Sequence, residues 1–302
     1  MTIFDNLIRW GLPVVPKVIV GRFARPYVAG PTLEHAVTAI QNIMKEGAMA
    51  TLDILGEEVS ERSKAESSTR EYLSLFDAIE QRNLDSNVSV KPTMLGMKID
   101  EAFCAENIDA IAAKAKEKNN FLRIDMEDHT TTSATLRIYR TMRERHGPHV
   151  GVVLQSYMRR TIDDINSLLD LKPNIRICKG IYREPRTVAW KGFETIQQNF
   201  VYATRKILSS GGYVGIATHD SHLVWSGMAL ADELGLNPEQ YEFQMLYGVD
   251  PGLRRIILDS GHRLRVYVPF GQDWYPYSMR RLRENPTIAK NVLNAMLGGG
   301  RT

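Results

Sequence analysis

The sequence predicts an α/β protein in which eight parallel strands alternate with helices and close into a barrel. Three observations support this prediction. Eight short apolar or β-branched runs end in a polar residue or a glycine, and helical periodicity follows them. The runs are nearly continuous in their apolar character, which is typical of a parallel sheet buried on both faces. The length of 302 residues is also compatible with one barrel of about 250 residues and additional N-terminal helices.

The elements follow one another in a regular order. Residues 68–81 and 108–118 carry apolar side chains at helical spacing. Thr161 is the expected N-cap of a third helix, 161–169, with acidic residues in its first turn. The eight expected strands are 49–55, 88–94, 121–126, 151–157, 175–181, 213–218, 241–246 and 264–268.

We divide the chain into an N-terminal helical arm (1–35), the (β/α)8 TIM-type barrel (36–296) and a disordered tail (297–302) that contains three glycines. The arm mixes apolar and basic residues. Because Pro13 and Pro16 interrupt any long amphipathic helix, we expect the arm to pack across one end of the barrel. Contact with a membrane surface is the alternative.

Composition excludes several classes of protein. The 38 basic and 35 acidic residues are spread along the chain, so no basic block indicates a nucleic-acid partner. Two cysteines provide neither a disulfide framework nor a zinc-binding spacing, which favours a reducing cytoplasm. No apolar stretch is long enough to span a membrane, and no secretory signal is recognisable.

Polar residues follow the strand ends. In barrels of this kind the loops at the carboxyl ends of the strands carry the chemistry, so these positions predict an active mouth. The sequence contains neither G-x-G-x-x-G nor a P-loop motif, so any nucleotide cofactor would have to bind through these loops. The strand-end residues are Asp53, Lys91, Asp125, Glu127, Gln155, Arg176, Lys179, Thr218, His219, Asp220, Gln244, Tyr247 and Tyr267.

Lys91 is costly to bury without a carboxylate, and Asp125 on the next strand is its expected partner. The pair would either stiffen the barrel or tune a site, whereas a lysine desolvated in this way also suits a Schiff-base aldolase. Arg176 and Lys179 suit an anionic ligand such as a pyrophosphate or a reduced flavin, and a solvated basic strand end is the alternative.

His219 lacks further ligands at supporting strand ends, so we expect no metal. It either binds a cofactor or is a satisfied buried histidine. The segment 274–286 groups Tyr277, Arg280, Arg281 and Glu284 along one helix side. Two arginines beside a tyrosine suit a carboxylate, and a solvated helix face is the alternative.

Several motifs together resemble the proline dehydrogenase family, in its short monofunctional bacterial form, from about Leu33 to Pro286. Each motif is weak alone, but their order along the chain is specific. The motifs cover residues 88–91 (VSVK), 123–127 (RIDME), 153–157 (VLQSY), 176–182 (RICKGIY), 217–220 (ATHD), 242–248 (EFQMLYG) and 275–284 (YPYSMRRLRE).

The resemblance implies FAD-dependent oxidation of L-proline to 1-pyrroline-5-carboxylate, with hydride transfer to the flavin and electrons passed to a quinone-type acceptor. It implies that Arg280 and Arg281 hold the proline carboxylate, and that Glu57 and Arg283 close the mouth. Other substrate-pocket residues would be Lys91, Asp125, Leu246, Tyr267 and Tyr277. Residues implied at the FAD are Met126, Val153, Gln155, Arg176, Cys178, Lys179, Gly180, Ile181, Tyr182, Thr218, His219 and Glu284.

Pro92, Cys178 and Ile181 depart from the family pattern, and these apolar changes affect fine geometry only. The length leaves no room for the aldehyde dehydrogenase domain of bifunctional relatives, so the product would pass to a separate pyrroline-5-carboxylate dehydrogenase. A quinone acceptor implies peripheral contact with the inner face of the cell membrane. A class I aldolase using Lys91 or Lys179, and a binding or scaffold module without turnover, are the alternatives.

Overall fold

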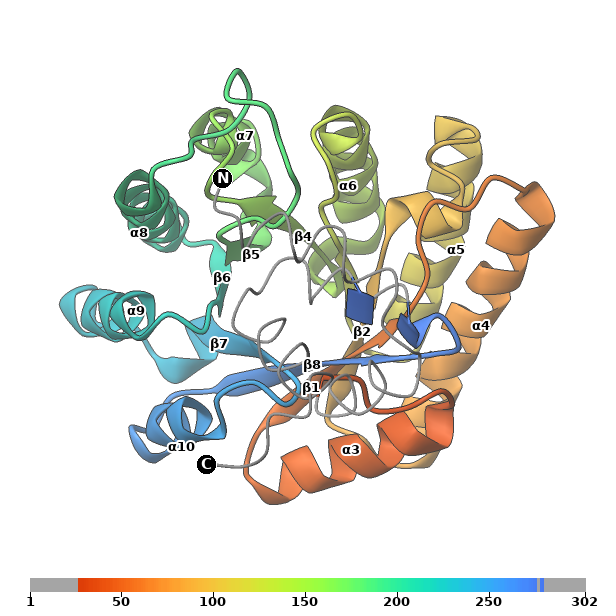
Figure 1. The fold of residues 1–302 in the computed structure, drawn as a ribbon, viewed down its shortest axis with the longest axis horizontal. Coiled ribbons are helices and arrows are strands. Elements are labelled where there is room, and N and C mark those ends of the chain that lie inside the picture. Colours follow the sequence, from red (N-terminus) through yellow and green to blue (C-terminus); the bar gives the residue numbers. More distant parts are fainter. Residues whose placement is uncertain (1–26, 276–277, 280–302) are drawn as a thin grey trace, which may run out of the picture.

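The computed structural model describes residues 27–275, 278 and 279. Residues 1–26 of the predicted arm and the whole predicted tail lie outside the described residues. The described part is a ring of helices around a central barrel of strands (Figure 1). No helix in residues 27–275 has the length and hydrophobicity that crossing a bilayer requires.

Eight strands form a closed barrel in sequential order, and each pairs in parallel with its neighbours, β8 with β1 included. The predicted (β/α)8 fold is therefore confirmed. The strands are β1 (Met49–Ile54), β2 (Ser86–Val90), β3 (Leu122–Ile124), β4 (Val150–Gln155), β5 (Asn174–Cys178), β6 (Tyr213–Ala217), β7 (Tyr241–Leu246) and β8 (Leu264–Phe270).

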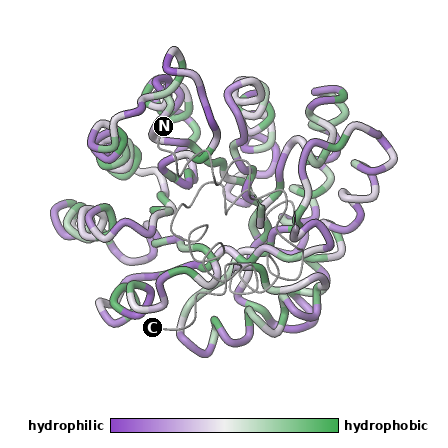
Figure 2. Tube along the Cα trace, in the orientation of Figure 1, coloured by the Kyte–Doolittle hydropathy of each residue, from purple (hydrophilic) through white to green (hydrophobic). Residues whose placement is uncertain are grey.

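Eight α-helices surround the barrel within the described residues. Hydrophobic and hydrophilic positions alternate around these helices (Figure 2), as packing of one face on a sheet requires. The helices are α3 (Leu33–Lys45), α4 (Arg62–Gln81), α5 (Glu101–Glu117), α6 (Thr132–His146), α7 (Thr161–Asn166), α8 (Phe193–Ser209), α9 (Ser221–Glu233) and α10 (Pro251–Asp259). Short 3-10 turns are η2 (Pro92–Leu95), η3 (Gly147–His149), η4 (Leu169–Leu171) and η5 (Pro238–Gln240).

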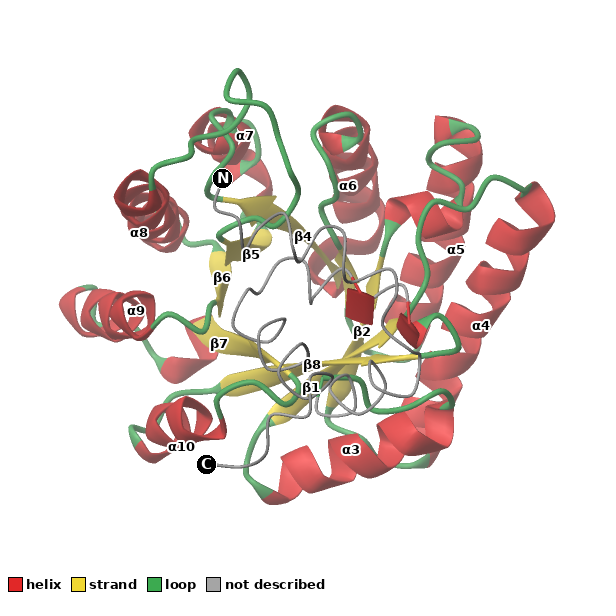
Figure 3. Cartoon of the chain, viewed as in Figure 1, coloured by secondary structure: helices red, strands yellow, loops and turns green. Residues whose placement is uncertain are grey.

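Helix α3 precedes the first strand, yet it packs against both β1 and β8 and fills the position where the ring closes (Figure 3). Its buried face includes Ile40 and Ile43. The expected division at residue 35 falls inside this helix. That division stays a prediction, since residues 1–26 are outside the described range.

Several predicted boundaries are wrong by a few residues. Strand β2 ends at Val90 instead of residue 94, because Pro92 lacks the N–H that a strand ladder needs and begins η2. Strands β4 and β5 also end earlier than predicted. Thr161 is the first residue of α7 and not its cap, because Arg160 occupies the N-cap position. The hydroxyl of Thr161 donates to the carbonyls of Gln155 and Met158.

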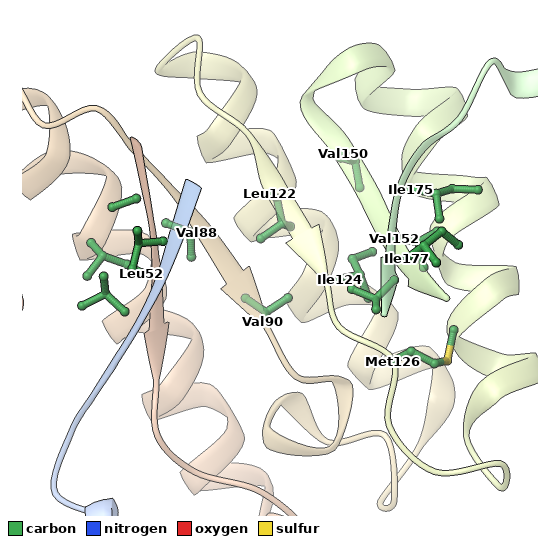
Figure 4. Close-up of a cluster of buried hydrophobic side chains, with 14 of the residues drawn as sticks. Leu52, Val88, Val90, Leu122, Ile124, Met126, Val150, Val152, Ile175 and Ile177 are labelled. Atoms are coloured by element: carbon green, nitrogen blue, oxygen red, sulfur yellow. The ribbon is translucent and has the colours of Figure 1, made fainter. Parts of the chain in front are cut away.

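The hydrophobic core lies between the strands and the helices. Leu52, Val88, Ile124, Val152 and Ile177 are nearly inaccessible, and Figure 4 shows them together as part of one cluster. Residues at the intervening positions of these strands point into the barrel. The core is therefore an annulus, and the interior of the barrel is filled separately.

The barrel interior is polar, so the expectation of nearly continuous apolar strands is wrong. Hydrogen bonds join strands or strand ends that are not neighbours, and such bonds have to cross the interior. Arg123 of β3 reaches Asn174 of β5, and Arg176 of β5 reaches Gln244 of β7. Along each strand, polar residues that face the barrel interior alternate with apolar residues that face the surrounding helices. Both sets are buried, because neither side of the strand faces water.

Candidate active site

A cavity of about 370 Å³ opens at the carboxyl ends of the strands. Every described residue that the family resemblance assigns to the site lines it, and with Glu57 these residues come from all eight strands or the loops that follow them. Of the predicted strand-end residues, Asp53, Asp220 and Tyr247 do not line it. The lining residues named from the sequence are Lys91, Asp125, Met126, Val153, Gln155, Arg176, Cys178, Lys179, Gly180, Ile181, Tyr182, Thr218, His219, Leu246 and Tyr267, with Glu57 at the same cavity. Glu127 and Gln244, named as strand-end residues, also line it, together with Ala217 and Met245.

Tyr277, Arg280, Arg281, Arg283 and Glu284 lie outside the described residues, and their roles stay predictions. The segment that leads to them begins beside the mouth. Trp274 packs against Val28 and Leu55, and Leu55 directly follows the carboxyl end of β1. Ser278 and Met279 are helical and buried.

Lys91 is paired with Asp53, and the expected partner Asp125 is wrong. The ammonium lies 2.7 Å from both carboxylate oxygens of Asp53, and both side chains are almost completely buried. Burial raises the pKa of Asp53 to about 6. Burial alone would lower the pKa of Lys91, but the carboxylates of Asp53 and Asp125 outweigh it and raise that pKa. Both partners are therefore ionised at neutral pH.

Asp125 instead receives three other donors. The hydroxyl of Ser89 donates at 2.6 Å and Nη1 of Arg176 at 2.9 Å, both to Oδ1, while the hydroxyl of Tyr267 donates at 3.0 Å to Oδ2. Lys91 donates to the same tyrosine hydroxyl at 3.3 Å. The phenol therefore links the two ion pairs.

Arg176 is held by a chain of groups that runs down the barrel. Its Nε donates to the side-chain oxygen of Gln244, and that amide donates to Glu242 at 2.6 Å. Glu242 also accepts from Arg265 at 2.9 Å. The Arg176 guanidinium lies 5.2 Å from the centroid of the Tyr267 ring. These contacts fix the guanidinium, and its Nη2 makes no hydrogen bond to the described residues, so it is available to a ligand.

Glu127 is a buried carboxyl group at the cavity wall. The backbone N–H and the hydroxyl of Thr93 donate to it at 2.8 and 2.6 Å. Burial is the larger influence and raises the pKa of Glu127 to about 7, although the bonds from Thr93 and the charge of Lys91 act in the opposite direction. This group therefore titrates near neutral pH.

Lys179 and Gly180 form the edge of the cavity after β5. The Lys179 ammonium lies 3.0 Å from Asp220, the N-cap of α9. Burial acts to raise the pKa of Asp220, but hydrogen bonds from Lys179 and Gln197 outweigh it and lower that pKa. Gly180 has φ +107°, and a Cβ there would lie 2.3 Å from the ring of Tyr157, so a glycine is required.

Two side chains at the wall are fixed in orientation. The amide nitrogen of Gln155 donates to the carbonyls of Met126 and Glu127, both at 3.0 Å, and its buried oxygen has no hydrogen-bond partner. The ring of His219 accepts the N–H of Leu246 at Nε2, 2.8 Å away, so the neutral ring carries its proton on Nδ1. This geometry is compatible with both alternatives for His219, a contact to a cofactor and a structural histidine.

The arrangement suits an anionic or electron-rich planar ligand. Cations from β5 and its loop, an unsatisfied amide oxygen and apolar side chains such as Val153 and Leu246 surround one cavity. Within the described residues, no group of three His, Cys, Asp or Glu side chains is arranged to hold a metal ion.

Comparison with known proteins gives consistent results. The family model described as proline dehydrogenase matches residues 36–294. Proline dehydrogenase of Deinococcus radiodurans is 38% identical over 280 residues, which is 91% of this chain and 90% of that protein. Proline dehydrogenase 1 of Bacillus subtilis strain 168 is 36% identical over 274 residues, 91% of this chain and 90% of that protein.

Solved structures show the same fold. Proline utilization A of Bdellovibrio bacteriovorus, inactivated by N-propargylglycine, aligns with a TM-score of 0.82 and 21% identity over 92% of this chain and 34% of that one. The corresponding protein of Corynebacterium freiburgense has a TM-score of 0.78 and 19% identity, over 97% of this chain and 35% of its own. The chain thus spans about a third of these larger proteins.

Proposed function

This chain belongs to the proline dehydrogenase family, and on that basis we propose that it oxidises L-proline to 1-pyrroline-5-carboxylate with bound FAD. In the reaction, the ring carbon next to the proline nitrogen loses a hydride and the nitrogen loses a proton, so that a C=N bond forms. FAD supplies the hydride acceptor when it is bound. The protein has to hold the substrate carbon against that acceptor and keep water out.

The residues at the mouth fit a flavin. The buried oxygen of Gln155 lacks a hydrogen bond, and the N–H of a flavin ring satisfies such an acceptor. This oxygen is the single observation that favours a ligand most directly, because an unsatisfied buried polar atom is costly. Arg176 and Lys179 add permanent positive charge at the same cavity. That charge stabilises an electron-rich ring in a site with little water.

We assign the carboxylate of proline to Arg280 and Arg281, which follow the buried Met279. Two guanidinium groups match the two carboxylate oxygens and fix the direction of the ring. Tyr277, Tyr267 and Leu246 complete the pocket, and Glu57 with Arg283 forms a gate. Leu246, Tyr267 and Glu57 line the cavity.

Lys91 acts in this proposal as a fixed charge and not as a nucleophile. Its ammonium donates to both oxygens of Asp53, and the neighbouring carboxylates raise its pKa. A Schiff base requires the neutral amine, so these carboxylates oppose the aldolase alternative at this residue. The buried ammonium also makes the electrostatic potential around Asp125 more positive.

The test is an absorbance spectrum of the purified protein, loaded with FAD, before and after addition of L-proline without oxygen. We expect the flavin bands to bleach with L-proline. A protein that binds FAD but keeps its bands through many equivalents of L-proline would contradict the proposal. Borohydride trapping with carbonyl substrates then tests the aldolase alternative, because only a Schiff-base enzyme is modified covalently.

We extend the proposal to the partners of the reaction. The electrons pass to a quinone-type acceptor, which requires peripheral contact with the inner face of the cell membrane. The product passes to a separate pyrroline-5-carboxylate dehydrogenase in the cytoplasm. Reoxidation of the proline-reduced protein by a soluble quinone, with and without anionic vesicles, measures the first of these steps.

A further inference from the structure

A second cavity, of about 420 Å³, lies at the amino-terminal end of the barrel, opposite the mouth. Arg123, Arg263 and Arg265 line it, with Asp85 and Glu242 as the carboxylates. Asp85 and Asn119 at its rim are exposed, so the cavity is open to solvent. We propose that this cavity binds a small oxyanion of the phosphate type.

The barrel interior contains one more cationic side chain than carboxylates. Three buried ion pairs, Lys91–Asp53, Arg176–Asp125 and Arg265–Glu242, use every carboxylate of these interior positions. Arg123 is also interior, yet it forms no ion pair with the described residues, and the nearby Glu242, which is already paired with Arg265, offsets its charge only in part. A buried cation without a counter-charge is costly, so the site favours an anion from solution.

The hydrogen bonds of Arg123 are incomplete in the same way. Nη1 donates to the carbonyls of Val152 and Asn174 at 3.0 and 2.9 Å, and Nη2 donates to the side-chain oxygen of Asn174 at 2.6 Å. The side chain is only 2% exposed, and its Nε is inaccessible to solvent and makes no hydrogen bond to the described residues. Burial and the charge of Arg176 lower the pKa of Arg123 to about 9. A bound anion would add negative charge and an acceptor for the second N–H of Nη2, which makes one hydrogen bond to the described residues.

Arg263 provides a second cation at the more open part of the cavity. Arg265, two residues further along the chain, is neutralised by Glu242, whereas Arg263 has no carboxylate partner among the described residues. Its guanidinium approaches the sulfur of Met49, at 3.3 Å. Arg263 is partly buried, so its charge is less screened than that of a surface arginine.

Other ligand classes fit less well. A divalent cation needs several carboxylates, but Glu242 is occupied by Arg265 and Gln244, which leaves only Asp85. An apolar ligand would leave the guanidinium group of Arg263 without an oxygen acceptor. Guanidinium groups match the oxygens of phosphate, so a phosphate group is the ligand that satisfies this wall.

The test is a calorimetric titration of the FAD-loaded protein with inorganic phosphate at constant ionic strength, repeated with glycerol 3-phosphate to separate a free ion from a phosphate ester. Arg123→Gln alters a buried network and risks the fold, so Arg263→Gln is the main variant. We expect binding to one site and at least about a tenfold weakening in Arg263→Gln, the effect of losing one charged hydrogen bond. Arg255→Gln on the exposed face of α10 is the matched control.

Lys179→Gln reports on the mouth, where phosphate also meets cations. The proposal requires that this variant bind phosphate as the unchanged protein does. It is overturned if neither ligand binds, if Arg263→Gln binds as tightly as the unchanged protein, or if Lys179→Gln abolishes binding. Because the readout is binding and not turnover, the result is independent of the proposed oxidation of proline.

Discussion

The ammonium of Lys91 lies 2.7 Å from each carboxylate oxygen of Asp53, and the Asp53 side chain is completely inaccessible to solvent. Neither charge has water to stabilise it, so each depends on the other. Lys91 lines the cavity and lies one hydrogen bond away from Tyr267. The integrity of the pair therefore affects both the stability of the barrel and the charge at the site.

Asp53→Asn leaves Lys91 as a buried cation without its partner. We expect the free energy of unfolding to fall by about 3 kcal/mol, measured by urea denaturation at pH 7. The double variant with Lys91→Met removes both charges, so it should be more stable than Asp53→Asn alone. Equal losses in Asp53→Asn and the double variant would contradict the expectation that the unpaired Lys91 charge causes the loss.

Glu127 makes the stability depend on pH. Its folded-state pKa of about 7 lies above the ordinary value of 4.5, so the folded state binds the proton more tightly. The stabilisation is complete below pH 4.5 and is lost as the pH rises through 7. Between pH 5 and pH 8 we expect a loss of about 2 to 3 kcal/mol that Glu127→Gln lacks.

Urea denaturation at several pH values measures this difference. Glu106→Gln on the exposed face of α5 is the control and should keep the pH dependence of the unchanged protein. Asp53, whose pKa is about 6, contributes in the same direction to both proteins and therefore cancels in the comparison. Parallel curves for Glu127→Gln and the unchanged protein would exclude a buried, protonated Glu127.

Tyr267→Phe removes the hydroxyl that joins Lys91 to Asp125. We expect a loss of about 1 kcal/mol in stability and at least about a tenfold lower kcat/KM for L-proline, because Asp125 loses a donor while the Lys91–Asp53 pair stays intact. Steady-state kinetics of the FAD-loaded variant measures this effect. Tyr202→Phe, on an exposed tyrosine of α8, should match the unchanged protein. Unchanged kinetics in Tyr267→Phe would show that the Tyr267 hydroxyl has no role in the reaction.

Arg280→Gln and Arg281→Gln test the proposed carboxylate clamp. Each variant should raise the KM for L-proline by about tenfold or more, while the flavin stays bound. The flavin absorbance of the purified variants and their steady-state kinetics measure the two effects separately. Arg255→Gln provides the surface control. An unchanged KM in both variants would mean that the carboxylate binds elsewhere.

Much of the mouth was predictable because strand ends are visible in a sequence. A polar residue that closes an apolar run, as Gln155 does, reaches the carboxyl edge of the barrel whatever the details of packing. Glycine at position 180 marks the turn out of β5. These local signals identified residues from all eight strands or the loops that follow them.

The partner of Lys91 could not be predicted in this way. Strand β2 has two neighbours, and the register places Asp53 beside Ser89 on one side and Arg123 beside Ser89 on the other. Asp53 and Asp125 both lie within reach of a lysine two residues beyond Ser89. The choice follows from Arg176, which reaches across the interior and takes Asp125. A contact between non-neighbouring strands leaves no mark in the local sequence.

The polar interior also constrains how this sequence can change over time. Its three ion pairs connect β1 with the residue after β2, the residue after β3 with β5, and β7 with β8. A substitution at one position therefore affects a residue far away in the sequence. Replacing one member alone leaves an unpaired buried charge, whereas replacing both removes the two charges together. Homologous barrels should therefore exchange these residues in matched pairs, and a designer who wishes to rebuild the interior has to alter two strands at once.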